Sequence, residues 1–311
     1  AWIEQVLIPR EAQRRGVQVL HFPDNTGCIR PTMPMVLTLH DSMWRRPLKE
    51  ALSHPTLRQR IQDAYRKWVC PRAARAAAAV ITVSEFSAQE LKSALSLKNV
   101  WVLPEGLDPR FEGRLSPARL RAELRGLGLS RPYVLCAGAA DARKNIERLI
   151  RAFASIRALD QADLVVTSLA PGEKAGALYL ETAARAGMAG RLRNTGYVTD
   201  PQMKALYQGA LIYAFPSLWE GFGLPILEAY ASGTPVLAAR AGALPETAGQ
   251  AAWLVDPLDE RDIASGLSAL LKRDRKREAA KGLKELARFS WDRTAAKTLK
   301  IYARAAGSGP A

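Results

Sequence analysis

Short apolar runs alternate with longer segments of helical spacing along most of this chain of 311 residues. Such alternation is typical of parallel sheets whose strands are joined by crossover helices. The chain is too long for one ordinary hydrophobic core, so two α/β domains in series are expected. The predicted strands are residues 17–22, 35–40, 79–84 and 99–104 in the first domain, and 132–138, 163–168, 192–198, 210–216, 234–240 and 251–255 in the second.

Helical patterns lie between these strands. Ser84 directly precedes one of them and is a favourable N-cap. Most of the predicted strands end in a small or polar residue, at the edge where open parallel sheets usually bind ligands. The predicted helices are residues 56–78, 85–95, 145–158, 201–209, 225–232, 245–248 and 259–272, with a further solvated helix at 272–288.

The charge of the chain bears on its partners. Lys and Arg number 45 against 30 Asp and Glu, a formal net charge of +15, which favours nucleic acid, anionic lipid or a phosphorylated substrate. No zinc-finger, RNP-like or KH-like pattern is present, so no nucleic-acid partner is expected. The sequence contains neither an apolar run long enough to span a membrane nor a signal-peptide pattern. We therefore expect a cytoplasmic protein, with a peripheral position at the inner membrane face as a further option.

The most basic segment is residues 44–75, which carries nine Lys or Arg against two acidic residues. Its apolar residues recur at helical spacing, and its basic residues lie off that stripe. The simpler interpretation is a surface helix whose apolar stripe packs on its own domain. The alternative is a basic amphipathic helix that lies on an anionic membrane surface. The stripe comprises Leu57, Ile61, Ala64, Tyr65, Trp68 and Val69.

Two glutamates bracket a glycine-rich loop in 219-WEGFGLPILEA-229. Gly221 and Gly223 allow a positive φ or a close approach of the backbone to a ligand. The N–H groups and dipole of the helix that follows favour negative charge. Glu220 at the strand exit and Glu228 one turn into the helix can accept hydrogen bonds from hydroxyls. The loop therefore suits a ligand with hydroxyls and phosphates, and a capping acid beside a routine strand–helix turn is the alternative.

A second loop, in 136-CAGAADARKNIERL-149, also joins a strand to a helix. Gly138 begins the turn, and Arg143 and Lys144 lie just before the helix. Two cations beside a helix N-terminus form an anion site, Arg by its bidentate fork and Lys as a point charge. Both loops leave the same edge of one predicted sheet. This coincidence favours a diphosphate bound between them over a basic loop without a ligand.

The pattern E-G-F-G-L-P-x-L-E-A, with its E-x7-E spacing, resembles the signature of retaining family-4 glycosyltransferases of the GT-B fold. Three segments resemble, in order, the family's donor-domain opening, its nucleobase-side loop and its closing helix: PYVLCAGAADARKNIERLIRAF, NTGYVTDPQMKALYQGA and FSWDRTAAKTLKIYARA. Upstream, LTLHDSMW, AVITVSEFSAQEL and VLPEGLDPRF resemble successive first-domain segments, most closely those of mannosyltransferases of polysaccharide assembly. The resemblance covers nearly the whole chain.

The resemblance implies an α/β architecture of the GT-B type, with two Rossmann-like domains whose parallel sheets face a cleft. Residues 1–112 would form the N-terminal acceptor-side domain and 113–294 the nucleotide-sugar-binding domain. A helix at 295–311 would cross back to the first domain. Family members usually begin with a strand, a glycine-rich loop and a helix that do not appear here. We therefore expect an incomplete N-terminal domain, arising either by truncation or by natural reduction.

The resemblance also implies a role for individual residues. Arg143 and Lys144 would neutralise the diphosphate of a nucleotide-sugar, and Glu228 would accept from its ribose hydroxyls. Glu220 would hold the sugar hydroxyls, and His40 would face the transferred sugar from the first domain. These residues make the implied catalytic set His40, Glu220, Arg143 and Lys144. The implied donor-binding set is Gly138, Arg143, Lys144, Tyr197, Val198, Glu220, Gly221, Phe222, Gly223, Leu224 and Glu228, with Tyr197 and Val198 flanking the base.

The implied reaction transfers a hexose, with mannose from GDP-mannose favoured, to a saccharide or lipid-linked acceptor with retention of configuration. Fixed cations and helix dipoles can stabilise the leaving phosphate, so no metal or other cofactor is required. Ala139 stands where many relatives carry Arg, which leaves the phosphate to Arg143 and Lys144. The alternatives are a truncated, inactive nucleotide-sugar-binding module, and a nucleotide-sugar epimerase or a phosphorylase of the same fold.

Overall fold

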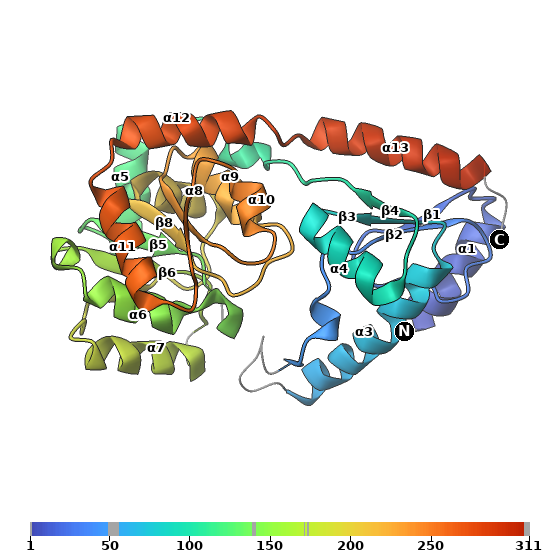
Figure 1. Cartoon of the computed structure of the whole chain (residues 1–311), viewed down its shortest axis with the longest axis horizontal. Helices are drawn as coiled ribbons and strands as arrows, with labels where there is room; N and C mark the ends of the chain where they lie inside the picture. The colour runs from blue at the N-terminus through green and yellow to red at the C-terminus, as the bar shows by residue number, and fades with distance from the viewer. Residues whose placement is uncertain (1, 49–55, 139–140, 171, 173, 308–311) are drawn as a thin grey trace. The chain divides into compact units, whose positions relative to one another are not determined.

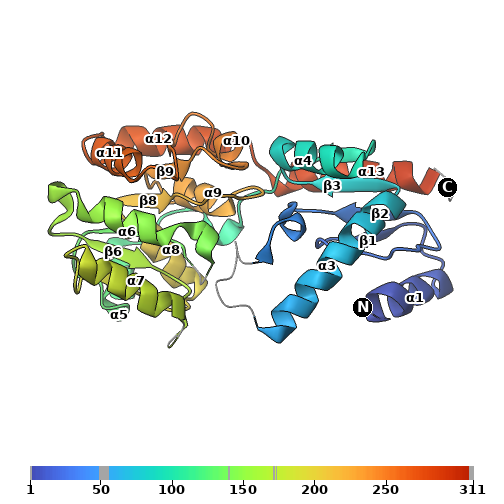
Figure 2. The ribbon, with the colours of Figure 1, turned by 60° about the horizontal axis from the view of Figure 1, so that its bottom comes forward.

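The computed structural model describes residues 2–48, 56–138, 141–170, 172 and 174–307. The chain forms two compact units, one of Ala1–Glu105 with Ser290–Ala311 and the other of Gly106–Phe289. Within each unit, helices pack around one sheet (Figures 1 and 2). The predicted domain boundaries, after residues 112 and 294, lie a few residues from those of the compact units.

The first unit is built on a parallel sheet in the order β1-β2-β3-β4. All four predicted strands are present and are shorter than predicted. The strands are β1 (Leu20–Phe22), β2 (Met35–Thr38), β3 (Ala79–Thr82) and β4 (Val100–Val102), and the covering helices are α3 (Leu57–Ala76), α4 (Glu85–Leu95) and α13 (Trp291–Gly307).

Successive side chains of a strand point to opposite sides of the sheet. Helices pack on both sides, so both faces of this sheet are buried. Leu37 and Val80 pack with residues of α3 and α4. Val36 and Ile81 pack instead with residues of α13. The closing helix thus supplies one of the two layers that complete the first unit, although it follows the second unit in sequence.

The second unit contains a six-stranded parallel sheet. Its strands are β5 (Tyr133–Cys136), β6 (Asp163–Val166), β7 (Leu192–Asn194), β8 (Ile212–Phe215), β9 (Val236–Ala239) and β10 (Trp253–Val255), in the order β10-β9-β8-β5-β6-β7. All six predicted strands are present. Its helices are α5 (Pro117–Gly126), α6 (Ile146–Ala154), α7 (Lys174–Arg185), α8 (Asp200–Gly209), α9 (Leu224–Ala231), α10 (Leu244–Ala248), α11 (Glu260–Leu271) and α12 (Arg275–Leu286).

Helices cover both faces of this second sheet. Val134 and Cys136 of β5 lie in one core with residues of α6, α7 and α11. Tyr133 and Leu135 lie in the other core with residues of α8 and α9. Near-continuous apolar strands are the expected sequence for a parallel sheet buried in this way.

The strand order reverses next to β5, the first strand of the second sheet in sequence. β5 pairs with β6 on one side and with β8 on the other. After β5 the chain extends the sheet through β6 and β7, and then returns to the opposite side of β5 to place β8, β9 and β10. The loops after β5 and β8 therefore leave adjacent strands and lead into helices on opposite faces. Ligands of open α/β sheets bind at this kind of position.

Three helices have no counterpart among those predicted. They are α5, α7 and α1 (Ile8–Arg14), which continues the π-helical segment η1 (Ile3–Leu7). For α5 a local signal exists, because Ser116 accepts a hydrogen bond from the backbone N–H of Arg119 and Pro117 occupies the first turn. Ser followed by Pro is a favourable helix start.

Helix α3 corrects one interpretation of the sequence. A capping box between Thr56 and Gln59 fixes its start, and only its second half buries side chains. Leu57 is 74% exposed, Ile61 61% and Trp68 45%. The simpler interpretation, that the apolar stripe packs on its own domain, is therefore wrong for these residues. None of the described helices combines the length and the hydrophobicity that a membrane-spanning segment needs.

Two glycines give a matched test of the packing of the second unit. A Cβ on Gly266 of α11 would lie 2.8 Å from side-chain atoms of Leu237 and Val255. A Cβ on Gly176 of α7 would meet nothing within 4 Å. Gly266→Ala should lower the free energy of unfolding by about 1–3 kcal/mol through overpacking. Gly176→Ala should raise it by about 0.5–1 kcal/mol, because alanine favours the helix.

Urea unfolding of both variants and the parent chain measures this difference. Equal shifts of the two variants in the same direction would contradict the packing of α11 on β9 and β10.

Candidate functional site

The structure joins the two predicted loops of the second unit directly. The backbone N–H of Leu218, after β8, donates to the carbonyl of Arg143, after β5, at 2.8 Å. Asn145 lies at the start of α6 with φ 60°, and its side chain is buried. The Asn145 amide donates to the carbonyls of Pro216 (3.1 Å) and Pro257 (2.7 Å). The loops after β5, β8 and β10 therefore meet at one side chain.

Lys144 and Glu220, one from each loop, form an ion pair. Lys144 Nζ lies 2.7 Å from Glu220 Oε1, and both side chains are largely buried. The ammonium also lies 4.8 Å from the centroid of the Phe215 ring. A cation over an aromatic face gains electrostatic stabilisation, and the carboxylate offsets its desolvation. The structure thus brings the predicted phosphate-binding lysine and the predicted sugar-binding glutamate into direct contact.

Arg143 is held by an acid that the sequence analysis missed. Its Nε lies 2.9 Å from Asp141 Oδ2, and its Nη2 lies 2.5 Å from the same atom. Asp141 Oδ1 also accepts from the backbone N–H of Arg143 at 3.0 Å. An Asp two residues before an Arg at a turn is the signal that could have revealed this contact. The guanidinium fork faces Asp141, so an incoming phosphate would share or replace that carboxylate.

The glycine-rich loop after β8 packs closely against α10. Gly223 has φ 113° at the N-cap of α9, and a Cβ there would lie 2.9 Å from Leu244. The carbonyl of the buried Phe222 accepts from Thr247 Oγ1 at 2.7 Å. Leu224 begins α9 directly after this turn. The loop is therefore held in shape from behind while its helix N-terminus points to the sheet edge.

Gly242 supports Glu220. It has φ +59°, and a Cβ there would lie 2.6 Å from the carbonyl oxygen of Glu220. The next residue, Ala243, donates its backbone N–H to that oxygen at 3.0 Å. Gly221 lies beside Glu220 and is half-buried. The loop after β9 thereby fixes the backbone of the predicted sugar-binding acid, a contact that the sequence motif did not indicate.

Gly138, in the loop after β5, allows a close approach of α6. A Cβ at this position would lie 2.7 Å from Ile146 Cδ1, so a side chain here would require the Ile146 side chain to shift. Ala139 lies outside the described residues.

Glu228 contacts a buried tyrosine of α8. Tyr207 donates its phenolic hydrogen to Glu228 Oε2 at 2.7 Å. Burial raises the pKa of Glu228, and the hydrogen bond from Tyr207 opposes that rise. Tyr207 is a further residue that the sequence analysis missed, because its spacing shows only that it faces the core.

The predicted base-flanking residues lie between β7 and α8. Tyr197 is 77% exposed. Val198 is partly buried against the core that contains residues of α8 and α9. Both residues belong to the turn that precedes α8. That helix begins with a capping box between Thr199 and Gln202.

His40 belongs to the first unit and follows β2. Its Nδ1 lies 3.2 Å from Glu105 Oε1, and its Nε2 lies 3.0 Å from the carbonyl oxygen of Pro23. Both neighbours accept hydrogen bonds, so the doubly protonated imidazolium satisfies both contacts. The hydrogen bond to Glu105 raises the pKa of His40 accordingly. A sugar hydroxyl that contacts Nε2 would replace the Pro23 carbonyl.

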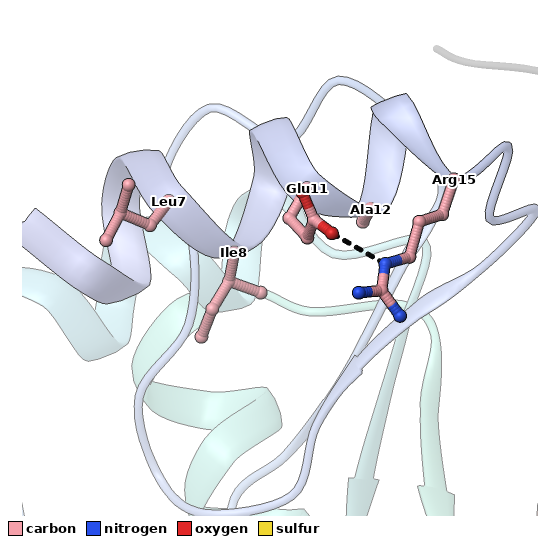
Figure 3. A pocket seen from close by; sticks show the side chains of 5 residues that line it. All are labelled: Leu7, Ile8, Glu11, Ala12 and Arg15. Atoms are coloured by element: carbon pink, nitrogen blue, oxygen red, sulfur yellow. Dashed lines mark hydrogen bonds and ion pairs between the residues drawn. The ribbon is translucent and has the colours of Figure 1, made fainter.

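Two further features of the described residues bear on ligand binding. No group of three or more His, Cys, Asp or Glu within the described ranges is arranged to hold a metal ion. A hollow of about 410 Å³ lies on the N-terminal helical segment and contains none of the predicted site residues (Figure 3). It is lined by Leu7, Ile8, Glu11, Ala12 and Arg15.

Two family models match the chain one after the other. The model described as Glycosyltransferase Family 4 matches residues 2–111, and the model described as Glycosyl transferases group 1 matches residues 131–273. The first match falls in the unit that contains His40. The second contains both loops of the candidate site.

Two curated relatives are mannosyltransferases. MMP alpha-(1->4)-mannosyltransferase of Mycolicibacterium hassiacum is 32% identical over 252 residues, covering 74% of this chain and 58% of the relative. O-antigen chain mannosyltransferase B of Escherichia coli is 30% identical over 205 residues, covering 64% of this chain and 52% of the relative. The matched part of the chain thus spans a little over half the length of each relative.

Among solved structures, a glycosyltransferase from Rickettsia africae is similar with a TM-score of 0.76 at 17% identity, covering 96% of this chain and 79% of that chain. The likeness extends over both parallel-sheet units and confirms the predicted GT-B fold. Since the two family models also follow one another over most of the chain, this chain belongs to the family-4 glycosyltransferases.

Proposed function

We propose that this chain transfers a hexose from a nucleotide-diphosphate sugar to a saccharide or lipid-linked acceptor with retention of anomeric configuration. The observation that carries the proposal is the contact between Lys144 and Glu220 at 2.7 Å. At the point where the strand order reverses, this contact joins a lysine suited to bind phosphate and a glutamate suited to accept hydrogen bonds from sugar hydroxyls. A donor with a diphosphate beside a sugar needs these two groups as neighbours.

The residues of the second unit divide the donor between them. Lys144 and Arg143 bind the diphosphate, assisted by the backbone of residues 221–224 at the N-terminus of α9. Glu220 accepts from sugar hydroxyls, and Glu228 accepts from ribose hydroxyls. Tyr197 and Val198 flank the base, and the glycine at position 138 keeps α6 close to the phosphates. His40 of the first unit donates to the transferred sugar from Nε2.

The chemistry needs no nucleophilic side chain. The bond between the anomeric carbon and the phosphate oxygen breaks, and its electron pair stays on the phosphate. The acceptor oxygen forms the new bond on the same face, and its proton passes to the leaving phosphate oxygen. Lys144 and Arg143 stabilise the charge that develops on that oxygen, since fixed cations cost little reorganisation.

GDP-mannose is the donor that we favour. Two relatives, 32% and 30% identical to this chain, are named as mannosyltransferases. UDP-glucose is the main competing donor. A nucleotide-sugar-binding module without turnover, and an epimerase of the same fold, remain distinct outcomes of the experiments below.

An anionic membrane surface is the second partner that we propose, with the protein peripheral to the cytoplasmic side. The exposed stripe of α3 supports it, because Leu57, Ile61 and Trp68 face solvent at i, i+4 and i+11. Basic residues flank the stripe. Asp63 is the one acidic residue of α3, and its Oδ2 lies 2.6 Å from Lys67 Nζ. Apolar groups between cations suit the boundary of headgroups and acyl chains. The flanking residues are Arg58, Arg60, Lys67 and Arg72.

The first prediction for the proposed function concerns Lys144. Lys144→Ala should lower kcat by about 100- to 1000-fold, the usual effect of removing one preorganised group that stabilises transition-state charge. Lys281→Ala is the matched control, because Lys281 also lies 2.7 Å from a glutamate, Glu278, on α12. Its kcat should equal that of the parent chain. Steady-state transfer of radiolabelled mannose from GDP-mannose measures both, and equal losses in the two variants would refute the phosphate role.

The second prediction concerns the nucleotide. GDP should raise the thermal midpoint more than UDP or ADP at equal concentration, because a ligand that binds only the folded state stabilises it. At a concentration of about 100 times Kd the gain is about 2.7 kcal/mol. A larger shift with UDP would indicate that the donor is a UDP-sugar and not a GDP-sugar. Binding without transfer or hydrolysis would favour the inactive module, and equilibration of the donor with its epimer would favour the epimerase.

The third prediction concerns α3. The chain should co-sediment with vesicles that contain phosphatidylglycerol and should do so less as salt is raised. The double variant Leu57→Gln/Ile61→Gln should bind at least about tenfold more weakly, since each buried aliphatic side chain contributes about 1.5–3 kcal/mol. Leu180→Gln is the matched control, because Leu180 of α7 is also 61% exposed. Equal binding by all three proteins would exclude α3 as the membrane-facing surface.

A further inference from the structure

Tyr207 stands out among the buried polar groups, because it is fully enclosed and yet ends on a predicted ligand-binding acid. Its side chain has 0% exposure. Its hydroxyl lies 2.7 Å from Glu228 Oε2. A carboxylate can only accept, so the tyrosine is the donor of this bond. α8 and α9, which carry the two residues, contact one another.

The direction of the tyrosine hydroxyl is fixed by its packing. The ring packs edge-on against two other rings, with centroid distances of 6.0 Å to Phe111 and 5.2 Å to Tyr213. The backbone carbonyl of Tyr207 also accepts from Thr234 Oγ1 at 2.5 Å. With ring and backbone both held, the phenol has little freedom to turn away from Glu228. One carboxylate oxygen is therefore occupied, and no residue within the described ranges donates a hydrogen bond to the other.

We propose that Tyr207 is a positioning residue that orients Glu228 so that its second carboxylate oxygen receives the ribose hydroxyls of the donor. The inference rests on the proposed function, because it assigns Glu228 to the ribose. It goes further by naming the residue that gives this acid its geometry. It also predicts that discrimination between ribose and 2′-deoxyribose depends on a side chain that does not touch the nucleotide.

The ionised carboxylate is the better acceptor of two hydroxyls, so the charges around Glu228 matter. The groups that face it are Asp108 and Arg110 at the 3-10 turn Pro109–Phe111, Asp200 at the start of α8, Tyr207 of α8 and Tyr213 of β8. Burial raises the pKa of Glu228, the two aspartates raise it further, and Tyr207 and Arg110 lower it. Removing the Tyr207 hydroxyl should therefore move the protonation of Glu228 to higher pH.

The test is the ratio of Kd values for the 2′-deoxy and ribose forms of a nucleoside diphosphate, measured by calorimetry. GDP, UDP and ADP are tried first, and the tightest binder is used. Tyr207→Phe should cut this ratio by about tenfold, equivalent to about 1.4 kcal/mol, because a displaced acceptor no longer favours the 2′-hydroxyl. A merely structural role would weaken both ligands equally and leave the ratio unchanged.

Tyr213→Phe is the matched control. Tyr213 is equally buried and packs on the same ring, but among the described residues its hydroxyl makes no hydrogen bond to Glu228. This variant should keep the parent ratio. A loss of discrimination in Tyr213→Phe as large as in Tyr207→Phe would overturn the assignment to the Tyr207–Glu228 bond.

The parent chain provides a second measurement that does not depend on how the variants fold. Its preference for ribose should be retained at neutral pH and lost as pH falls through the raised pKa of Glu228, above the ordinary 4.5. In Tyr207→Phe the same loss should occur at higher pH. A preference that does not change with pH would overturn the inference alone. Failure of the parent chain to bind any of the nucleoside diphosphates would overturn the proposed function with it.

Discussion

The position of the candidate site depends on the pairing of β5 with a parallel strand on each side. From β5 the chain adds strands toward one edge of the sheet and later toward the other. β6 lies on one side of β5 and β8 on the other, so the loops after β5 and β8 start next to each other and then diverge. Parallel strands deliver these loops to the same edge, and the helices after them present their N-termini there. Charge and chemistry can therefore be supplied by two short segments that are far apart in sequence.

The two predicted phosphate-binding cations are each paired with a carboxylate. Lys144 faces Glu220, and Arg143 faces Asp141. Partly buried charges require such partners, because an unpaired ion in a low-dielectric site is costly. A diphosphate that enters would exchange one set of negative oxygens for another, so the gain in binding is a difference between two paired states. The acid released from Lys144 would then be available to sugar hydroxyls, which links phosphate binding to sugar binding.

The sequence allowed all ten strands to be predicted, because buried parallel strands are short apolar runs that contrast with what surrounds them. The two loops were identified for a similar reason, since glycines and charges stand out directly after such runs. Contacts between loops were not predictable. Nothing in the motif relates Gly242 to Glu220 or Tyr207 to Glu228, because the fold alone makes them neighbours. For α3, periodicity identified the apolar stripe but carried no information on what covers it.

Asn145 has a consequence for how the loops respond to a ligand. Its single amide group binds the carbonyls of Pro216 and Pro257 while its own backbone begins α6. A local opening of any one of these three loops must break a bond that another loop shares. The three segments should consequently exchange their amide hydrogens as one cooperative block, and immobilising the first should slow exchange in the last, more than a hundred residues later in the chain.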